Sequence, residues 1–63
     1  MKATIRMTNN DTFEFHNIDD ESIKYISDCF IRNYIFEINH SKGEKTIFNS
    51  NQISTIKFEE KQE

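Results

Sequence analysis

Proline, tryptophan, leucine and valine are absent from this chain of 63 residues, and glycine and cysteine occur once each. A single glycine excludes the glycine-rich loops that cradle phosphate groups. Because Cys29 has no second cysteine to pair with, no intramolecular disulfide forms, which is typical of a reducing compartment and predicts a cytoplasmic protein. No apolar run approaches the length of a signal-peptide core or a membrane span, so we expect no membrane partner.

The apolar residues that are present favour β-structure. Ten Ile, six Phe and two Tyr dominate them, and these residue types fit pleated, half-buried surfaces. The length allows one small domain, residues 1–63, of marginal stability, which a second subunit or another partner would stabilise. Eleven acidic and eight basic residues give a net charge of −3, and this balance disfavours duplex DNA as a partner.

The first two strands are expected in a hairpin. Residues 2–8 and 12–16 each alternate between apolar and polar side chains, as half-buried strands do. Side chains face the same side of a sheet only if the numbers of opposite residues sum to an even number. A three-residue loop at 9–11 meets this condition and sets Met7 opposite Phe13, and Asn or Asp tolerates the left-handed conformation that the loop needs.

A helix over residues 20–32 follows. Asp19 is the expected N-cap, and the acidic residues after it suit the positive end of the helix dipole. Cys29 falls on the apolar stripe that should face the core. Asn33 is a suitable left-handed stop. An alternative ends the helix near Cys29 and starts the next strand at Phe30.

The second half of the chain reads as three further strands. They are expected at 34–40, 44–49 and 54–60, with one helical turn at 50–53. Gly43 supplies the left-handed residue of a loop at 41–43, which sets Phe36 opposite Phe48. The fold class is therefore α+β, in the order ββαβββ, with one helix packed on a small curled antiparallel sheet. A charged tail, residues 59–63, should fray.

The predicted core collects the inward-facing apolar residues: Ile5, Met7, Phe13, Phe15, Ile23, Ile26, Phe30, Phe36, Ile38, Phe48, Ile53, Ile56 and Phe58.

No catalytic, cofactor-binding or metal-binding residue is predicted. His16, Cys29 and His40 are the soft metal ligands, and none lies at ligand spacing from another. Cys29 belongs to the apolar stripe, where a reactive thiolate is disfavoured. The acidic residues 19–21 are explained by the helix start. We therefore expect a protein that is not an enzyme and has no small-molecule substrate.

Four residues form a candidate interface. In the expected register Ile35 and Ile47 point away from the helix, with Glu37 beside them, and Tyr25 lies on the exposed side of the helix. Scattered exposed apolar residues are normal on protein surfaces. Two isoleucines on one face of so small a sheet would also fit a docking surface, and the sequence leaves both interpretations open.

The second half of the chain resembles small accessory proteins of bacteriophages and mobile elements of low-GC Gram-positive bacteria. The similarity covers about 25 residues and lies in 35–39, Gly43, 47–49 and 52–56, a hairpin with a glycine turn followed by an Asn and two Ile three apart. The resemblance implies an adaptor or inhibitor of a host protein. A similar ending occurs in SH3-like barrels, including Sm-like RNA-binding proteins, but these carry a glycine-bent second strand, and residues 12–16 hold no glycine.

These observations lead to one hypothesis and two alternatives. The hypothesis is a non-enzymatic protein-binding module, phage-encoded, that acts as an accessory or inhibitor of a host protein. The alternatives are a small sheet protein associated with nucleic acid and a structural protein that forms homo-oligomers. A homodimer is the expected form of self-association, since closed two-fold dimers are the commonest oligomers.

Overall fold

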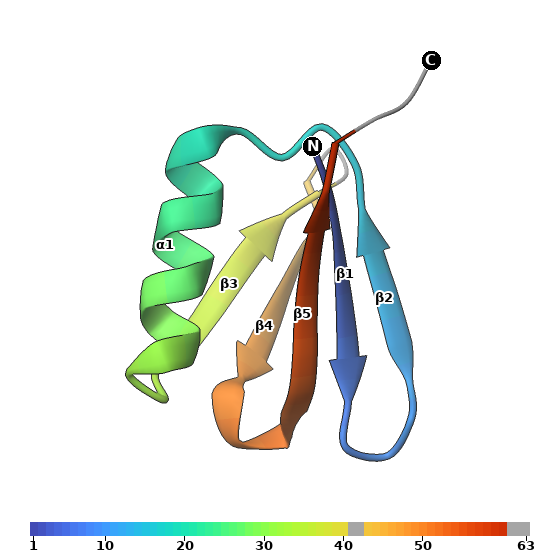
Figure 1. The fold of residues 1–63 in the computed structure, drawn as a ribbon, viewed down its shortest axis with the longest axis vertical. Helices are drawn as coiled ribbons and strands as arrows, with labels where there is room; N and C mark the ends of the chain where they lie inside the picture. The colour runs from blue at the N-terminus through green and yellow to red at the C-terminus, as the bar shows by residue number, and fades with distance from the viewer. Residues whose placement is uncertain (41–42, 61–63) are drawn as a thin grey trace.

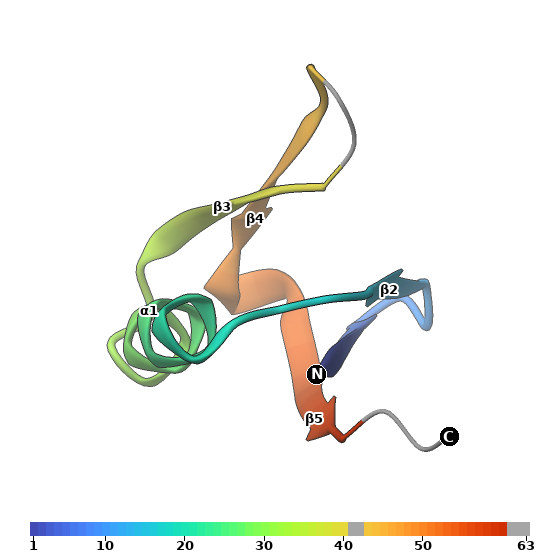
Figure 2. The same cartoon turned by 90° about the horizontal axis from the view of Figure 1, so that it is seen from above.

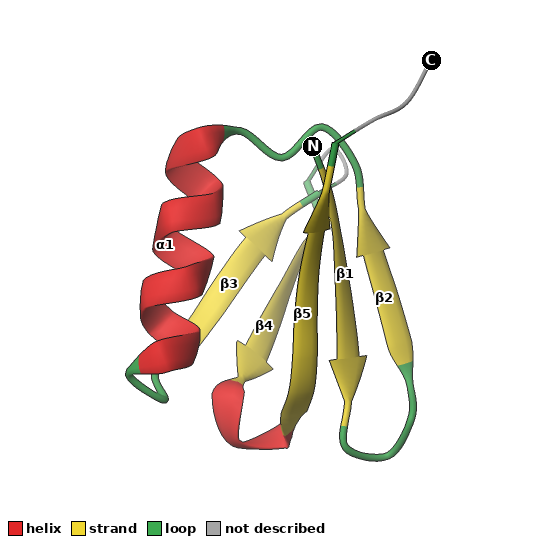
Figure 3. Cartoon of the chain, viewed as in Figure 1, coloured by secondary structure: helices red, strands yellow, loops and turns green. Residues whose placement is uncertain are grey.

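The computed structural model describes residues 1–40 and 43–60 (Figure 1). The α+β class and the order ββαβββ are confirmed (Figure 3). The elements are β1 (Lys2–Met7), β2 (Thr12–Phe15), α1 (Asp20–Ile31), β3 (Ile35–Asn39), β4 (Lys45–Asn49), the 3-10 helix η1 (Ser50–Gln52) and β5 (Ile53–Glu59).

The five strands form two antiparallel sheets and not the single sheet that was expected. One sheet has the order β2-β1-β5, and the other consists of β3 and β4. Viewed from above, the β3–β4 hairpin points away from the three-stranded sheet, and α1 lies end-on beside the start of β3 (Figure 2). Because α1 packs mainly against β3, the helix adjoins one strand and does not cover a whole sheet.

Both ends of α1 follow the predicted pattern. Asp19 is the N-cap, and its Oδ1 accepts a hydrogen bond from Ser22 N at 2.8 Å. Asn33 follows the helix with φ +61°, and Tyr34 N donates to Cys29 O at 2.8 Å. This bond closes a Schellman motif, so the alternative in which the helix ends near Cys29 is wrong.

The second hairpin has the predicted register. Phe36 lies opposite Phe48, and Ile38 opposite Thr46. Gly43 has φ +75°, as the left-handed residue of the turn requires. The other two residues of the expected loop, 41–42, lie outside the described part of the chain.

The first hairpin is shifted by two residues from the predicted register. Met7 N donates to Asp11 O at 2.8 Å, so Ile5, and not Met7, lies opposite Phe13. The left-handed residue of the loop is Asn10, with φ +76°. The prediction was wrong because both registers meet the even-number rule and several neighbouring residues tolerate the left-handed conformation.

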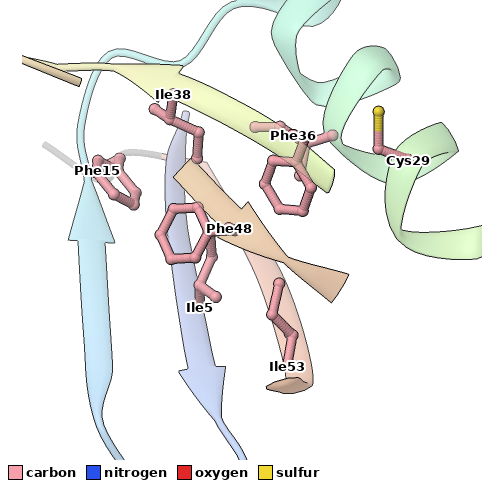
Figure 4. Packing of buried hydrophobic residues seen from close by; sticks show 8 residues of the cluster. Ile5, Phe15, Cys29, Phe36, Ile38, Phe48 and Ile53 are labelled. Atoms are coloured by element: carbon pink, nitrogen blue, oxygen red, sulfur yellow. The ribbon is translucent and has the colours of Figure 1, made fainter. Parts of the chain in front are cut away.

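One core joins the two sheets and the helix (Figure 4). Its buried cluster consists of Ile5, Phe15, Ile26, Cys29, Phe36, Ile38, Phe48 and Ile53. The Phe48 ring lies 5.4 Å from that of Phe36 and 5.9 Å from that of Phe15, measured between centroids, so it connects β4 with β3 and with β2. Ala3 is also buried.

The predicted core list needs one correction. Phe13, on the edge strand β2, is 37% exposed, although its ring contacts Phe48 edge-on. Four other members are half-buried and pack against the core: Met7, Phe30, Ile56 and Phe58. Ile23 is half-buried as well.

The last strand, expected at 54–60, is β5, and the frayed tail starts later than expected. Glu59, which was assigned to the frayed tail, is the final residue of β5 and lies opposite Lys2. Residues 61–63 are outside the described part of the chain. Before β5, the predicted helical turn is present as η1, and its buried Ser50 donates from Oγ to Tyr34 O at 2.5 Å. This bond attaches η1 to the segment that precedes β3.

Candidate docking surface

The structure brings the four predicted interface residues together around the outer face of the β3–β4 hairpin. Since Phe36 and Ile38 point into the core, the alternation of β3 turns Ile35 and Glu37 outward. Ile47 on β4 faces the same way and lies directly opposite Glu37. Ile35 is 65% exposed and Ile47 is 62% exposed, so both side chains remain largely in solvent.

Glu37 takes part in an ion pair across the hairpin. Its Oε2 lies 3.4 Å from Lys45 Nζ, and both side chains are about half exposed. An exposed pair of this kind contributes little to stability. It does leave the two charges of this face balanced, beside two isoleucines, in a chain whose net charge is −3.

Tyr25 reaches this face from the helix. It is 46% exposed, and its hydroxyl accepts a hydrogen bond from Glu37 N at 3.4 Å. The backbone N–H of Glu37 points away from β4, so the tyrosine lies along the free edge of β3. Tyr25 therefore marks the border between the outer face of the hairpin and α1.

One neighbour of this surface was not predicted. The strand expected at 34–40 included Tyr34, but β3 begins at Ile35 and Tyr34 is 56% exposed. The left-handed turn at Asn33 changes the chain direction just before it. Tyr34 and Tyr25 both line a shallow cleft of about 260 Å³ beside the end of α1. An aromatic residue immediately after a left-handed helix stop was the signal available in the sequence.

The soft metal ligands lie apart from this surface. Cys29 is buried as a free thiol in the core. His40 has Nε2 at 2.8 Å from Thr46 Oγ1, and its ring centroid lies 5.3 Å from that of Phe15. Within residues 1–40 and 43–60, no three His, Cys, Asp or Glu side chains come together as metal ligands would.

Among residues 1–40 and 43–60, Asp19 is the group whose pKa is shifted by its surroundings. The backbone hydrogen bond from Ser22, with a smaller contribution from the Ser22 side chain, lowers the pKa of the Asp19 carboxyl below its usual value. The cause is helix capping, which favours the ionised form.

In the part that the structure describes, no helix has the length and apolar character needed to cross a membrane. Comparison with protein-family models, with characterised proteins and with solved structures found no match.

Proposed function

We propose that this chain is a non-enzymatic protein-binding module that docks through the outer face of the β3–β4 hairpin, and that the protein it binds there is a second copy of itself. The observation that carries the proposal is the pair Ile35 and Ile47, each more than half exposed on a face whose charges are balanced. Exposed apolar surface on a small domain indicates an interaction site.

The charges of the hairpin face favour a second copy of the chain as its partner. Two chains of net charge −3 repel each other over most of their surfaces, but on this face the charges of Glu37 and Lys45 balance, so that repulsion is absent there. The hairpin face carries Glu37 and Lys45 on adjacent strands, so a two-fold axis through it allows each Glu37 to meet the Lys45 of the other copy. The isoleucines would then be buried between the exchanged charges.

The biological setting follows from the resemblance in the second half of the chain. It supports a phage-encoded accessory protein or inhibitor, for which the same face would be available to a host protein when the dimer dissociates. A lone buried cysteine suits a reducing compartment such as the cytoplasm.

Sedimentation velocity between about 1 and about 300 µM tests the proposal through mass action. The wild-type chain should change from one-chain to two-chain mass across this range. Ile35→Lys combined with Ile47→Lys should remain a single chain throughout, because charged side chains would be buried against each other.

Ile31→Lys is the matched control. Ile31 is 80% exposed at the end of α1, and six residues separate it from Tyr25, which places it about 120° away around the helix. This variant should dimerise like the wild type. A wild-type chain that stays single at every concentration contradicts self-association. A dimer that survives the double substitution but is lost in Ile31→Lys places the interface elsewhere.

A further inference from the structure

A second surface lies at the opposite end of β3, between this strand and the first turns of α1. A cleft of about 550 Å³ is lined here by β2, the segment that leads to α1, the first half of α1, and β3. Figure 1 shows β3 diverging from α1 towards its C-terminal end, and Figure 2 shows the same divergence from above. The volume lies in the range of ligand-binding clefts, about 300 to 1,000 Å³.

The wall that β3 contributes is an edge of unpaired backbone. His40 N donates to Glu44 O at 3.2 Å, so the alternation of an antiparallel ladder turns the N–H and C=O of Asn39 away from β4. The bond from Glu37 N to Tyr25 Oη, two residues earlier, confirms that this side of β3 faces α1. Asn39 N has no hydrogen-bond partner among residues 1–40 and 43–60.

Tyr25 shows what this edge accepts. Its hydroxyl oxygen occupies the position at which the carbonyl of a neighbouring strand would meet Glu37 N. Two residues further along the same edge, the backbone N–H and C=O of Asn39 face the cleft. An added strand would therefore pair with Asn39, while Tyr25 keeps the edge position at Glu37.

The charge of the cleft selects the partner. Its lining residues include two carboxylates, Asp19 and Glu37, and no lysine or arginine. Because Glu37 also pairs with Lys45 on the outer face of the hairpin, Asp19 is the main acidic group of the cleft. The buried core residues Phe15, Ile26 and Ile38 lie beneath it, and most of its exposed lining is polar. An acidic segment would be repelled, whereas a basic one would be attracted.

We propose that this cleft binds an extended, basic peptide segment of a partner protein, which adds as a strand to the free edge of β3 at Asn39. Main-chain hydrogen bonds to the strand edge supply the affinity, and lysine or arginine side chains meet the acidic rim. The cleft shares Glu37 and Tyr25 with the hairpin face. The cleft is tested at Asn39 and the face at Ile35 and Ile47, so either proposal can fail while the other holds.

Selection from a random heptapeptide library displayed on phage tests the inference, with the wild-type chain as the immobilised target. Seven residues are enough to span β3, a strand of five residues. We expect enriched sequences to be rich in Lys and Arg. A synthetic enriched peptide, titrated into ¹⁵N-labelled protein, should shift the amide signal of Asn39 more than those of Ile35 and Ile47.

Two substitutions of Asn39 distinguish the contribution of its backbone N–H to peptide binding from that of its side chain. Asn39→Pro removes the N–H that faces the cleft without removing a bond to β4, and Asn39→Ala keeps that N–H. We expect the peptide to bind Asn39→Pro about tenfold more weakly and Asn39→Ala nearly as well as wild type.

N-methylation of the peptide provides a test that leaves the protein intact if Asn39→Pro fails to fold. Only alternate residues of an added strand direct their N–H to β3, so methylation in one phase should abolish binding and methylation in the other should not. Equal effects in both phases contradict strand addition.

Three other results would overturn the inference. The first is a library selection with no enrichment over an unrelated immobilised protein. The second is a selected peptide that shifts the amide signals of Ile35 and Ile47 but not that of Asn39. The third is protection of the Asn39 amide from hydrogen exchange as the concentration of the protein alone rises. The last result would assign the edge of β3 to a second copy of the chain.

Discussion

The outer face of the β2-β1-β5 sheet is polar throughout, whereas the outer face of β3–β4 carries two exposed isoleucines. The register places these side chains on the first face: Lys2, Thr4, Arg6, Thr12, Glu14, Thr55, Lys57 and Glu59. Ion pairs join Lys2 to Glu14 at 3.6 Å and Lys57 to Glu59 at 3.8 Å. Both sheets direct Ile and Phe side chains inward, so they differ only in what they present to solvent.

This difference separates the residues that stabilise the fold from those available for binding. In the three-stranded sheet, all the side chains on the solvent-exposed face are polar, so a sheet of this chain does not need apolar residues on that face. Ile35 and Ile47 are therefore not required to close the core, from which they point away. Their exposure supports the proposal that this face docks on another protein chain.

The largest expected effect comes from the residue that connects the two sheets. Phe48→Ala removes a ring that packs against Phe36, Phe15 and Phe13, and should lower the free energy of unfolding by about 3–5 kcal/mol. In a marginal domain this unfolds most of the population, and circular dichroism during urea titration measures it.

The neighbouring position provides the control. Ile47→Ala, on the opposite face of the same strand, should change the free energy of unfolding by no more than about 0.5 kcal/mol. If the two alanine variants unfold at the same urea concentration, the assignment of inner and outer faces in β4 is wrong.

The turns of the two hairpins allow a second, smaller test. Gly43 and Asn10 both have positive φ, and no atom lies within 4 Å of a Cβ added at Gly43, so a substitution there acts through the backbone. Gly43→Val and Asn10→Val should each cost about 1–3 kcal/mol. Gly43→Asn should cost less, because asparagine tolerates this conformation. Thermal unfolding of the three variants checks the order, and equal midpoints for Gly43→Val and Gly43→Asn would contradict the turn.

The smallest expected effect concerns acid stability at the start of α1. Because the folded state lowers the pKa of Asp19, its contribution is present above the unfolded value of about 3.9 and is lost as the pH falls through the folded pKa. Asp19→Asn still caps the helix but does not titrate. The urea midpoints of the wild type and this variant should therefore differ at pH 7 and converge once the pH has fallen through the folded pKa of Asp19. A difference that stays constant across this range would contradict the capping role of the ionised carboxylate.

The two hairpins also show how far local sequence predicts register. Gly43 is the only glycine, so one turn position was preferred and the second hairpin was predicted correctly. The first turn lies within a run of residues that tolerate it almost equally. There the register is decided by packing, since Ala3, with a side chain of one carbon, lies opposite both Phe15 and Phe58 and is completely buried.

One of the two candidate sites was predicted from local sequence and the other was not. The outward positions of Ile35, Glu37 and Ile47 follow from strand alternation and were predicted from the sequence. The cleft beside Asn39 was not, because its walls come from β2, α1 and β3, and no local pattern specifies how far α1 and β3 diverge.

The sequence by itself determined the order of the elements, the apolar face of each strand, both ends of the helix and the turn at Gly43. Each of these depends on interactions among residues a few positions apart, such as a cap, a left-handed residue or an alternation of side chains. Only the tertiary structure decided that the strands divide into two sheets, that Tyr25 meets the edge of β3 and that a cleft opens beside Asn39. These features depend on which distant segments pack together, and alternation is the same whichever strand becomes the neighbour.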